Sequence, residues 1–97
     1  MSRYVALDRE RLTVSTVTKQ LTDAKVRAAG IEYALIKVES NGIYESIVGT
    51  ASSSVGRERF NGDEFEVWTI NDLLLWNAVR SGSADAAVEV EYFGRKQ

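Results

Sequence analysis

The segment Ala86–Phe93 alternates apolar and more polar side chains at every second position. One face carries Ala86, Val88, Val90 and Tyr92, and the other carries Ala87, Glu89, Glu91 and Phe93. Successive side chains of a β-strand point to opposite faces, so this period predicts a half-buried strand. Phe93 ends the more polar face, and we expect that end of the face to meet a partner.

Similar alternation recurs along the chain between turn signals. Residues 33–39 alternate, and Asn41-Gly42 follows, the dipeptide that best tolerates the positive φ angles of a tight turn. The pattern therefore predicts a hairpin over residues 33–48. Asn61-Gly62-Asp63 predicts a second turn, which leads into a strand at 65–68. Residues 4–7 and 12–18 also favour strands, because threonine and valine suit the pleated backbone.

Three stretches are less regular. Residues 16–30 have near-helical apolar spacing with Gly30 as a possible C-cap, and they also fit a strand, a turn and an extended approach to Ile31. Residues 69–80 favour one helical turn at 70–74, and then a strand at 75–80 paired across 81–83 with the final strand. Residues 50–59 are small and polar, which predicts a loop.

These elements together predict an all-β fold. The 97 residues include seven glycines and no proline, and the turn signals leave room for six to eight short strands. Short strands joined by tight turns are typical of an antiparallel β-sandwich. We expect one domain over residues 1–97, with an α+β fold of one or two helices as the alternative.

The composition excludes several kinds of chemistry. The chain has no cysteine, which excludes disulfides and thiolate sites, and no histidine, the commonest general base near neutral pH. The net charge of −2 predicts no nucleic-acid partner, because such affinity depends on neutralising phosphates. A basic cluster is the alternative for five residues, but we expect them to be solvated surface charges: Arg57, Arg59, Arg80, Arg95 and Lys96. The longest apolar run, residues 73–76, predicts neither a signal peptide nor a membrane span.

The remaining reactive groups do not form a persuasive active site. Glu64 and Glu66 share a strand face, as do Glu89 and Glu91, and alternating glutamates are typical of a solvated face that discourages edge pairing. The serine run 52–54 has no adjacent base or nucleophile-elbow glycines. A calcium site from Asp63, Glu64 and Asp85 lacks EF-hand spacing. We therefore expect no enzyme activity, no cofactor and no metal.

Large apolar side chains concentrate in residues 68–76, and part of that segment is expected to lie on an interface. A thin sandwich cannot easily enclose two tryptophans and three leucines, and tryptophan is favoured at interface centres. The candidate interaction residues are Trp68, Ile70, Leu73, Leu74, Trp76 and Phe93. An alternative is a sugar-binding module whose stacking platforms would be Tyr4, Tyr33, Tyr44 and Tyr92.

Four short motifs follow one another within residues 11–93: Ala34-Leu35-Ile36-Lys37-Val38, Gly49-Thr50-Ala51 with Gly56, Gly62-Asp63, and Val90-Glu91-Tyr92-Phe93. Their order resembles that in a group of small virion proteins of tailed bacteriophages. The resemblance implies a β-sandwich component of the virion, such as a capsid decoration (cement) protein or another accessory head protein. Its implied partner is the major capsid protein, and its implied location is the capsid surface after synthesis in the host cytoplasm.

The implied mechanism is a clamp across adjacent capsid subunits. Many copies of a modest interface stabilise a whole particle without strong individual contacts. A homo-oligomer, with a trimer favoured, would match the local symmetry of an icosahedral lattice. Two alternatives remain. One is an inhibitor that binds a host protein and uses its own acidic surface to mimic nucleic acid, and the other is a sugar-binding module on a tail or fibre.

Overall fold

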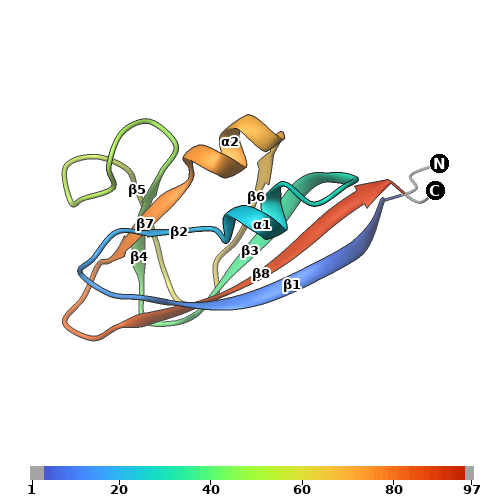
Figure 1. Cartoon of the computed structure of the whole chain (residues 1–97). Coiled ribbons are helices and arrows are strands. Elements are labelled where there is room, and N and C mark those ends of the chain that lie inside the picture. Colours follow the sequence, from blue (N-terminus) through green and yellow to red (C-terminus); the bar gives the residue numbers. More distant parts are fainter. Residues whose placement is uncertain (1–3, 96–97) are drawn as a thin grey trace.

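Eight strands form two four-stranded antiparallel sheets in the computed structural model, which describes residues 4–95 (Figure 1). In chain order the elements are β1 (Tyr4–Val14), β2 (Lys19–Gln20), α1 (Asp23–Val26), β3 (Ile31–Ser40), β4 (Ile43–Ser46), β5 (Arg57–Arg59), β6 (Glu64–Trp68), α2 (Ile70–Leu75), β7 (Asn77–Arg80) and β8 (Ala86–Arg95). The expected all-β sandwich is confirmed.

The two sheets differ in length. The long sheet has the order β1-β8-β3-β6, and the short sheet has the order β2-β7-β4-β5. Figure 1 shows that the short sheet lies over one end of the long sheet and that α1 and α2 lie over its middle, while the start of β1 and the end of β8 extend beyond the helices. The molecule is consequently elongated, with principal extents of 43 × 24 × 22 Å.

The core lies between the long sheet and the layer formed by the short sheet and the helices. The strand β8 alternates buried and half-buried residues along almost its whole length, which confirms the two-residue pattern. The short sheet contributes Ile43 and Ala78, and the helices contribute Val26 and Leu73. Apolar burial is the main force that holds these layers together, at about 25 cal/mol per Å² of buried apolar surface.

The predicted hairpin over residues 33–48 is wrong, because β3 and β4 belong to different sheets. The strand β3 pairs with β6 and β8, whereas β4 pairs with β5 and β7. Asn41 does have the positive φ expected of this turn, at 59°. A tight turn reverses the chain locally, but in a sandwich the reversed strand can enter the opposite sheet.

The predicted pairing of the 75–80 strand with the final strand is wrong for the same reason. The strand β7 lies in the short sheet and β8 in the long sheet. The two crossovers lie side by side, because the Asn41 side-chain amide donates to the Asp85 carbonyl at 2.8 Å. The Ser81 amide also donates to the Gly42 carbonyl at 2.9 Å.

Several element boundaries also differ from expectation. The two strands expected in residues 4–18 are one long strand, β1, which ends at Val14. The ambiguous stretch 16–30 contains both a short strand, β2, and a single helical turn, α1. The helical turn expected at 70–74 is present as α2, and β7 begins only at Asn77. The expected loop at 50–59 ends in a strand, β5.

Tyr92 is a buried ionisable group at the centre of the core. Its side chain is fully buried, and its hydroxyl donates a hydrogen bond to the Glu10 carboxylate. Burial raises the pKa of Tyr92 far above its ordinary value of 10.0, and the hydrogen bond and charge of Glu10 raise it further. The folded protein therefore keeps this proton at a pH where the unfolded chain releases it.

We expect the free energy of unfolding to fall as the pH rises above 10. The loss attributable to Tyr92 is about 1.4 kcal/mol per pH unit, since one proton is involved. Urea unfolding followed by circular dichroism between pH 8 and pH 11 measures this slope. The Tyr92→Phe variant, which has no proton to release, is expected to lose stability less steeply. Equal slopes in the two proteins would contradict the assignment.

Candidate functional site

Four aromatic side chains, here called the aromatic row, cluster at one end of the outer face of the long sheet. They come from four different strands: Tyr4 on β1, Phe93 on β8, Tyr33 on β3 and Trp68 on β6. Phe93, Tyr33 and Trp68 are direct cross-strand neighbours in the register. Tyr33 stacks on Trp68 with ring centroids 4.1 Å apart and on Phe93 at 4.9 Å. Tyr4 meets Tyr33 and Trp68 edge-on.

The alternation of the strands places this cluster on the outside. On β3, Ala34 and Ile36 are buried, so Tyr33 points to the opposite face. At the end of β6, Thr69 adopts a φ of 75°, and its side chain accepts a hydrogen bond from the Asp72 amide at 3.3 Å. This turn starts α2 and leaves Trp68 outside while Leu73 enters the core.

Polar contacts fix the rim of the aromatic row. The Trp68 Nε1 donates to Glu66 at 2.9 Å, and the Arg95 guanidinium lies 5.0 Å from the Tyr4 ring centroid. Desolvation raises the pKa of Tyr33, and the charge of Glu66 adds to the effect. The phenol of Tyr33 is therefore neutral at physiological pH.

The rest of the outer face carries charged residues in ion pairs. Arg9 meets Glu91 at 2.7 Å, Arg11 bonds to Glu39, and Lys37 lies 4.0 Å from Glu64. Exposed pairs of this kind contribute only about 0–1 kcal/mol each. The outer face of the long sheet thus has an aromatic end and a charged end.

The ring geometry removes Tyr33 from the candidates for sugar stacking. Both faces of Tyr33 are covered by neighbouring rings, so that ring has no open face for a sugar. Of the other tyrosines considered for this role, Tyr92 is fully buried and Tyr44 lies on β4 of the short sheet. The four tyrosines do not form one surface.

The six sequence-predicted interaction residues separate into two groups. Trp68 and Ile70 are 41% and 44% exposed, and Leu74 and Phe93 are partly buried. Leu73 and Trp76 are core residues, 1% and 0% exposed, so their assignment to a contact surface is corrected. Leu73 lies within α2, which turns its side chain into the core, and Trp76 follows the helix as its extended C-cap residue, whereas a sequence pattern shows only that the segment is apolar.

Two members of the aromatic row, Tyr4 and Tyr33, were not among the predicted interaction residues. The alternation of residues 33–39 was the available signal, since it assigns Tyr33 to the face opposite Ile36. That signal does not reveal that four strands bring their aromatic residues to the same end of one sheet.

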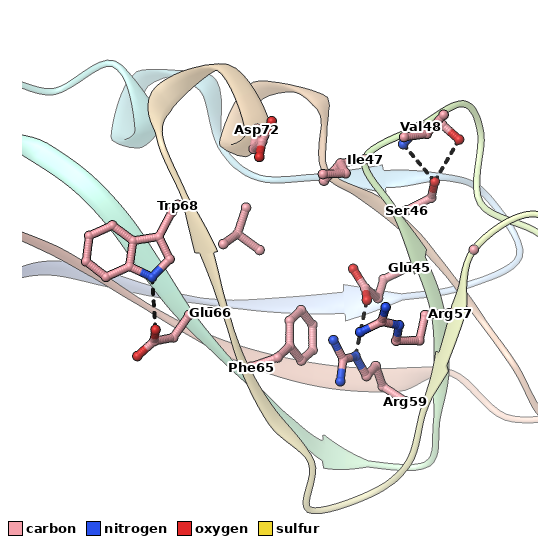
Figure 2. Close-up of a pocket in the computed structure, with 12 residues that line it drawn as sticks. Glu45, Ser46, Ile47, Val48, Arg57, Arg59, Phe65, Glu66, Trp68 and Asp72 are labelled. Atoms are coloured by element: carbon pink, nitrogen blue, oxygen red, sulfur yellow. Dashed lines mark hydrogen bonds and ion pairs between the residues drawn. The ribbon is translucent and has the colours of Figure 1, made fainter.

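A groove runs between β5 and β6, the edge strands of the two sheets (Figure 2). Its volume is about 490 Å³, and Phe65, Val67 and Ile47 contribute apolar lining. Figure 2 shows Asp72 and Trp68 near one end, and Arg57 and Arg59 on the β5 side. We call this cavity the β5–β6 groove.

A buried polar network supports the base of the groove. The Glu45 carboxylate accepts hydrogen bonds from Trp76 Nε1 at 3.0 Å and from Arg59 Nε at 3.1 Å. The Arg59 guanidinium also lies 4.2 Å from the centroid of the Phe65 ring. The buried charge of Glu45 is therefore paired and hydrogen-bonded, as a buried charge must be if it is not to destabilise the fold.

The other candidate sites are not assembled. Asp63, Glu64 and Asp85 form no metal-binding group, and residues 4–95 contain no cluster of three or more potential ligands of the acidic, histidine or cysteine type. In the serine run, Ser52 accepts hydrogen bonds from the amides of Ser54 and Val55, which closes a turn.

The basic residues are also dispersed. Arg59, Arg80 and Arg95 pair with acidic residues in different parts of the molecule, namely Glu45, Asp85 and Glu32. Lys96 lies outside the described residues. No helix within residues 4–95 is long and apolar enough to cross a membrane.

Comparisons with family models, with curated proteins and with solved structures found no match to this chain.

Proposed function

We propose that this protein is a non-enzymatic structural component of a bacteriophage virion, a capsid decoration protein that binds the major capsid protein lattice and stabilises the head. The observation that carries the proposal is the aromatic row. Aromatic side chains are enriched in the centres of protein interfaces, where they bury large areas at low entropic cost. Here they are held on four adjacent strands and therefore need little ordering on binding.

The surroundings of the aromatic row fit a protein partner. Ion pairs such as Arg9–Glu91 continue the same face and provide the polar rim typical of an interface. An interface of about 800 Å² per partner, repeated at each lattice position, stabilises the particle as a whole. Self-association into a trimer would place several aromatic rows around one symmetry axis.

The alternative function, an inhibitor that mimics nucleic acid through its own acidic surface, has weaker support. The glutamates it requires share the outer face, but Glu91 is bonded to Arg9 and Glu89 lies 3.8 Å from Arg11. These cations reduce the local negative potential that a nucleic-acid mimic needs.

The test is the copy number of the chain in purified phage particles, measured by quantitative mass spectrometry against the major capsid protein. A decoration role predicts a copy number comparable with that of the capsid subunit. A few copies per particle would instead favour the tail or a fibre. Absence from the particle would overturn the proposal and favour an inhibitor of a host protein.

We expect the Tyr33→Ser/Trp68→Ser variant to lose incorporation into particles by about tenfold or more, because it removes the centre of the aromatic row. The matched control is Val17→Ser, which alters a residue that is 74% exposed in the connection between β1 and β2. Both purified variants are checked for a native circular dichroism spectrum. Equal incorporation of the two folded variants would contradict the assignment of the contact.

A further inference from the structure

The strand β6 has an open edge. It is the outermost strand of the long sheet, and in the described part of the chain it pairs only with β3. A backbone hydrogen bond lies at each end of the β3–β6 pairing. The Val38 amide donates to the Asp63 carbonyl at 2.9 Å, and the Thr69 amide donates to the Glu32 carbonyl at 3.0 Å. Because alternate residues of an antiparallel strand face the same neighbour, the backbone groups of Glu64, Glu66 and Trp68 point away from β3.

The β5–β6 groove lies along this open edge. Its volume of about 490 Å³ is within the range of cavities that hold ligands. Phe65 and Val67 face the groove from β6, and Ile47 and Val48 face it from the connection after β4. An additional strand paired with β6 would place every second side chain over this apolar lining.

The wall opposite β6 is held in place by a buried side chain. Asn77 Oδ1 accepts a hydrogen bond from the Ala51 amide at 2.7 Å, and Asn77 Nδ2 donates to the Gly49 carbonyl at 2.9 Å. The Ser46 hydroxyl bonds to the amide and the carbonyl of Val48, both at 2.9 Å. The groove is therefore preformed, so little ordering is required when it is filled.

The charges beside the open edge indicate what would bind there. Glu64 and Glu66 flank the edge on the outer face, and within residues 4–95 Glu66 has no cationic partner. Like charges directly opposite each other destabilise a strand pair. Antiparallel pairing of two copies of β6 about Glu66 would place this residue opposite itself, which argues against a second copy as the occupant.

We propose that the open edge of β6 and the β5–β6 groove bind an extended segment of another protein by strand addition. The segment has apolar, β-branched residues that enter the groove, alternating with lysine or arginine residues opposite Glu64 and Glu66. This inference goes beyond the proposed function, because it rests on an edge and a groove that share only Trp68 with the aromatic row.

The test uses a short capped peptide in which lysine and valine alternate. Binding to the full chain is followed by amide chemical shifts in ¹H–¹⁵N NMR spectra. We expect saturable binding, with the largest shifts at Glu64, Glu66 and Trp68. A peptide that alternates glutamate and valine is expected to bind about fivefold more weakly or worse. Failure of the lysine peptide to bind saturably, or equal affinity for both peptides, would overturn the proposal.

Two variants sharpen the test. Glu66→Lys is expected to weaken the lysine peptide about fivefold and to strengthen the glutamate peptide. The control Glu89→Lys makes the same change of net charge on β8, away from the edge, and is expected to leave both affinities unchanged. If both variants changed the peptide affinities equally, long-range electrostatics alone would account for the change, and the assignment of the binding site to the β6 edge would be overturned.

A backbone variant tests strand addition itself. Glu66→Pro removes an amide that faces away from β3, so the sheet is expected to remain intact while binding of the lysine peptide is lost. Undiminished binding by folded Glu66→Pro would exclude strand addition at this edge. The Tyr33→Ser variant is expected to retain peptide binding, which separates this result from the test of the proposed function.

Discussion

Replacing Trp76 by alanine is expected to lower the free energy of unfolding by about 3–5 kcal/mol, the cost of removing a large aromatic side chain from a packed core. Trp76 is fully buried and contacts the core where both sheets and α2 meet. Such a loss is a large fraction of the about 5–15 kcal/mol that keeps a domain folded.

The substitution also removes a hydrogen bond to a buried charge. The indole Nε1 donates to Glu45 at 3.0 Å, and without it this carboxylate retains, among residues 4–95, only Arg59 as a side-chain partner. The variant Trp76→Phe keeps an aromatic ring but loses the Nε1 donor together with part of the buried ring volume. It is expected to cost about 1–3 kcal/mol.

The second tryptophan provides a matched control. Trp68 is 41% exposed and rests on Tyr33 rather than in the core. Trp68→Ala is expected to cost only about 1–2 kcal/mol, mainly from the lost aromatic stacking. Urea unfolding followed by far-ultraviolet circular dichroism measures all three variants. Equal destabilisation by Trp76→Ala and Trp68→Ala would contradict the division of the tryptophans between core and surface.

The second large effect is expected from Gly94→Ala. An added Cβ at this position would lie 1.9 Å from the Gly30 carbonyl oxygen and 2.7 Å from Leu7 Cδ1. Neither backbone can move without disturbing the β1–β8 or the β3–β8 ladder, which both run through this point. The expected destabilisation is about 3 kcal/mol, at the upper end of the range for overpacking.

Gly82→Ala is the control for Gly94→Ala. Within residues 4–95, no atom lies within 4 Å of a Cβ added at Gly82. This variant is expected to be unchanged or stabilised by up to about 1 kcal/mol, because alanine reduces the entropy of the unfolded chain. Thermal unfolding of both variants measures the difference, and a Gly94→Ala protein as stable as Gly82→Ala would refute the close approach of the two backbones.

The close approach at Gly94 also illustrates a limit of local patterns. Glycines are turn signals in a sequence, and Gly62, with a φ of 96°, follows that expectation. Gly94 instead lies inside β8, where the carbonyl oxygen of Gly30, the residue before β3, would lie 1.9 Å from an added Cβ. Position 94 must be glycine because of a residue 64 positions earlier in the chain, so no local sequence pattern predicts this requirement.

The interaction residues show the same limit. The apolar character of residues 68–76 did not separate Trp68 and Ile70, which are exposed, from Trp76, which is buried. Burial of a side chain near a helix end depends on the direction in which the helix leaves the sheet, and that direction is set by Thr69 and by packing against β3.

The all-β class, the alternation of β8 and the positions of most turns could be predicted from the amino-acid sequence alone. Side-chain period and turn chemistry are local properties, so a linear pattern is enough to show them. Only the tertiary structure decided which sheet each strand joins, that Tyr4, Tyr33, Trp68 and Phe93 meet, and that β6 borders a groove. These features depend on contacts between segments that are distant in the sequence. Burial of apolar surface stabilises those contacts, and a sequence pattern does not show which surfaces will meet.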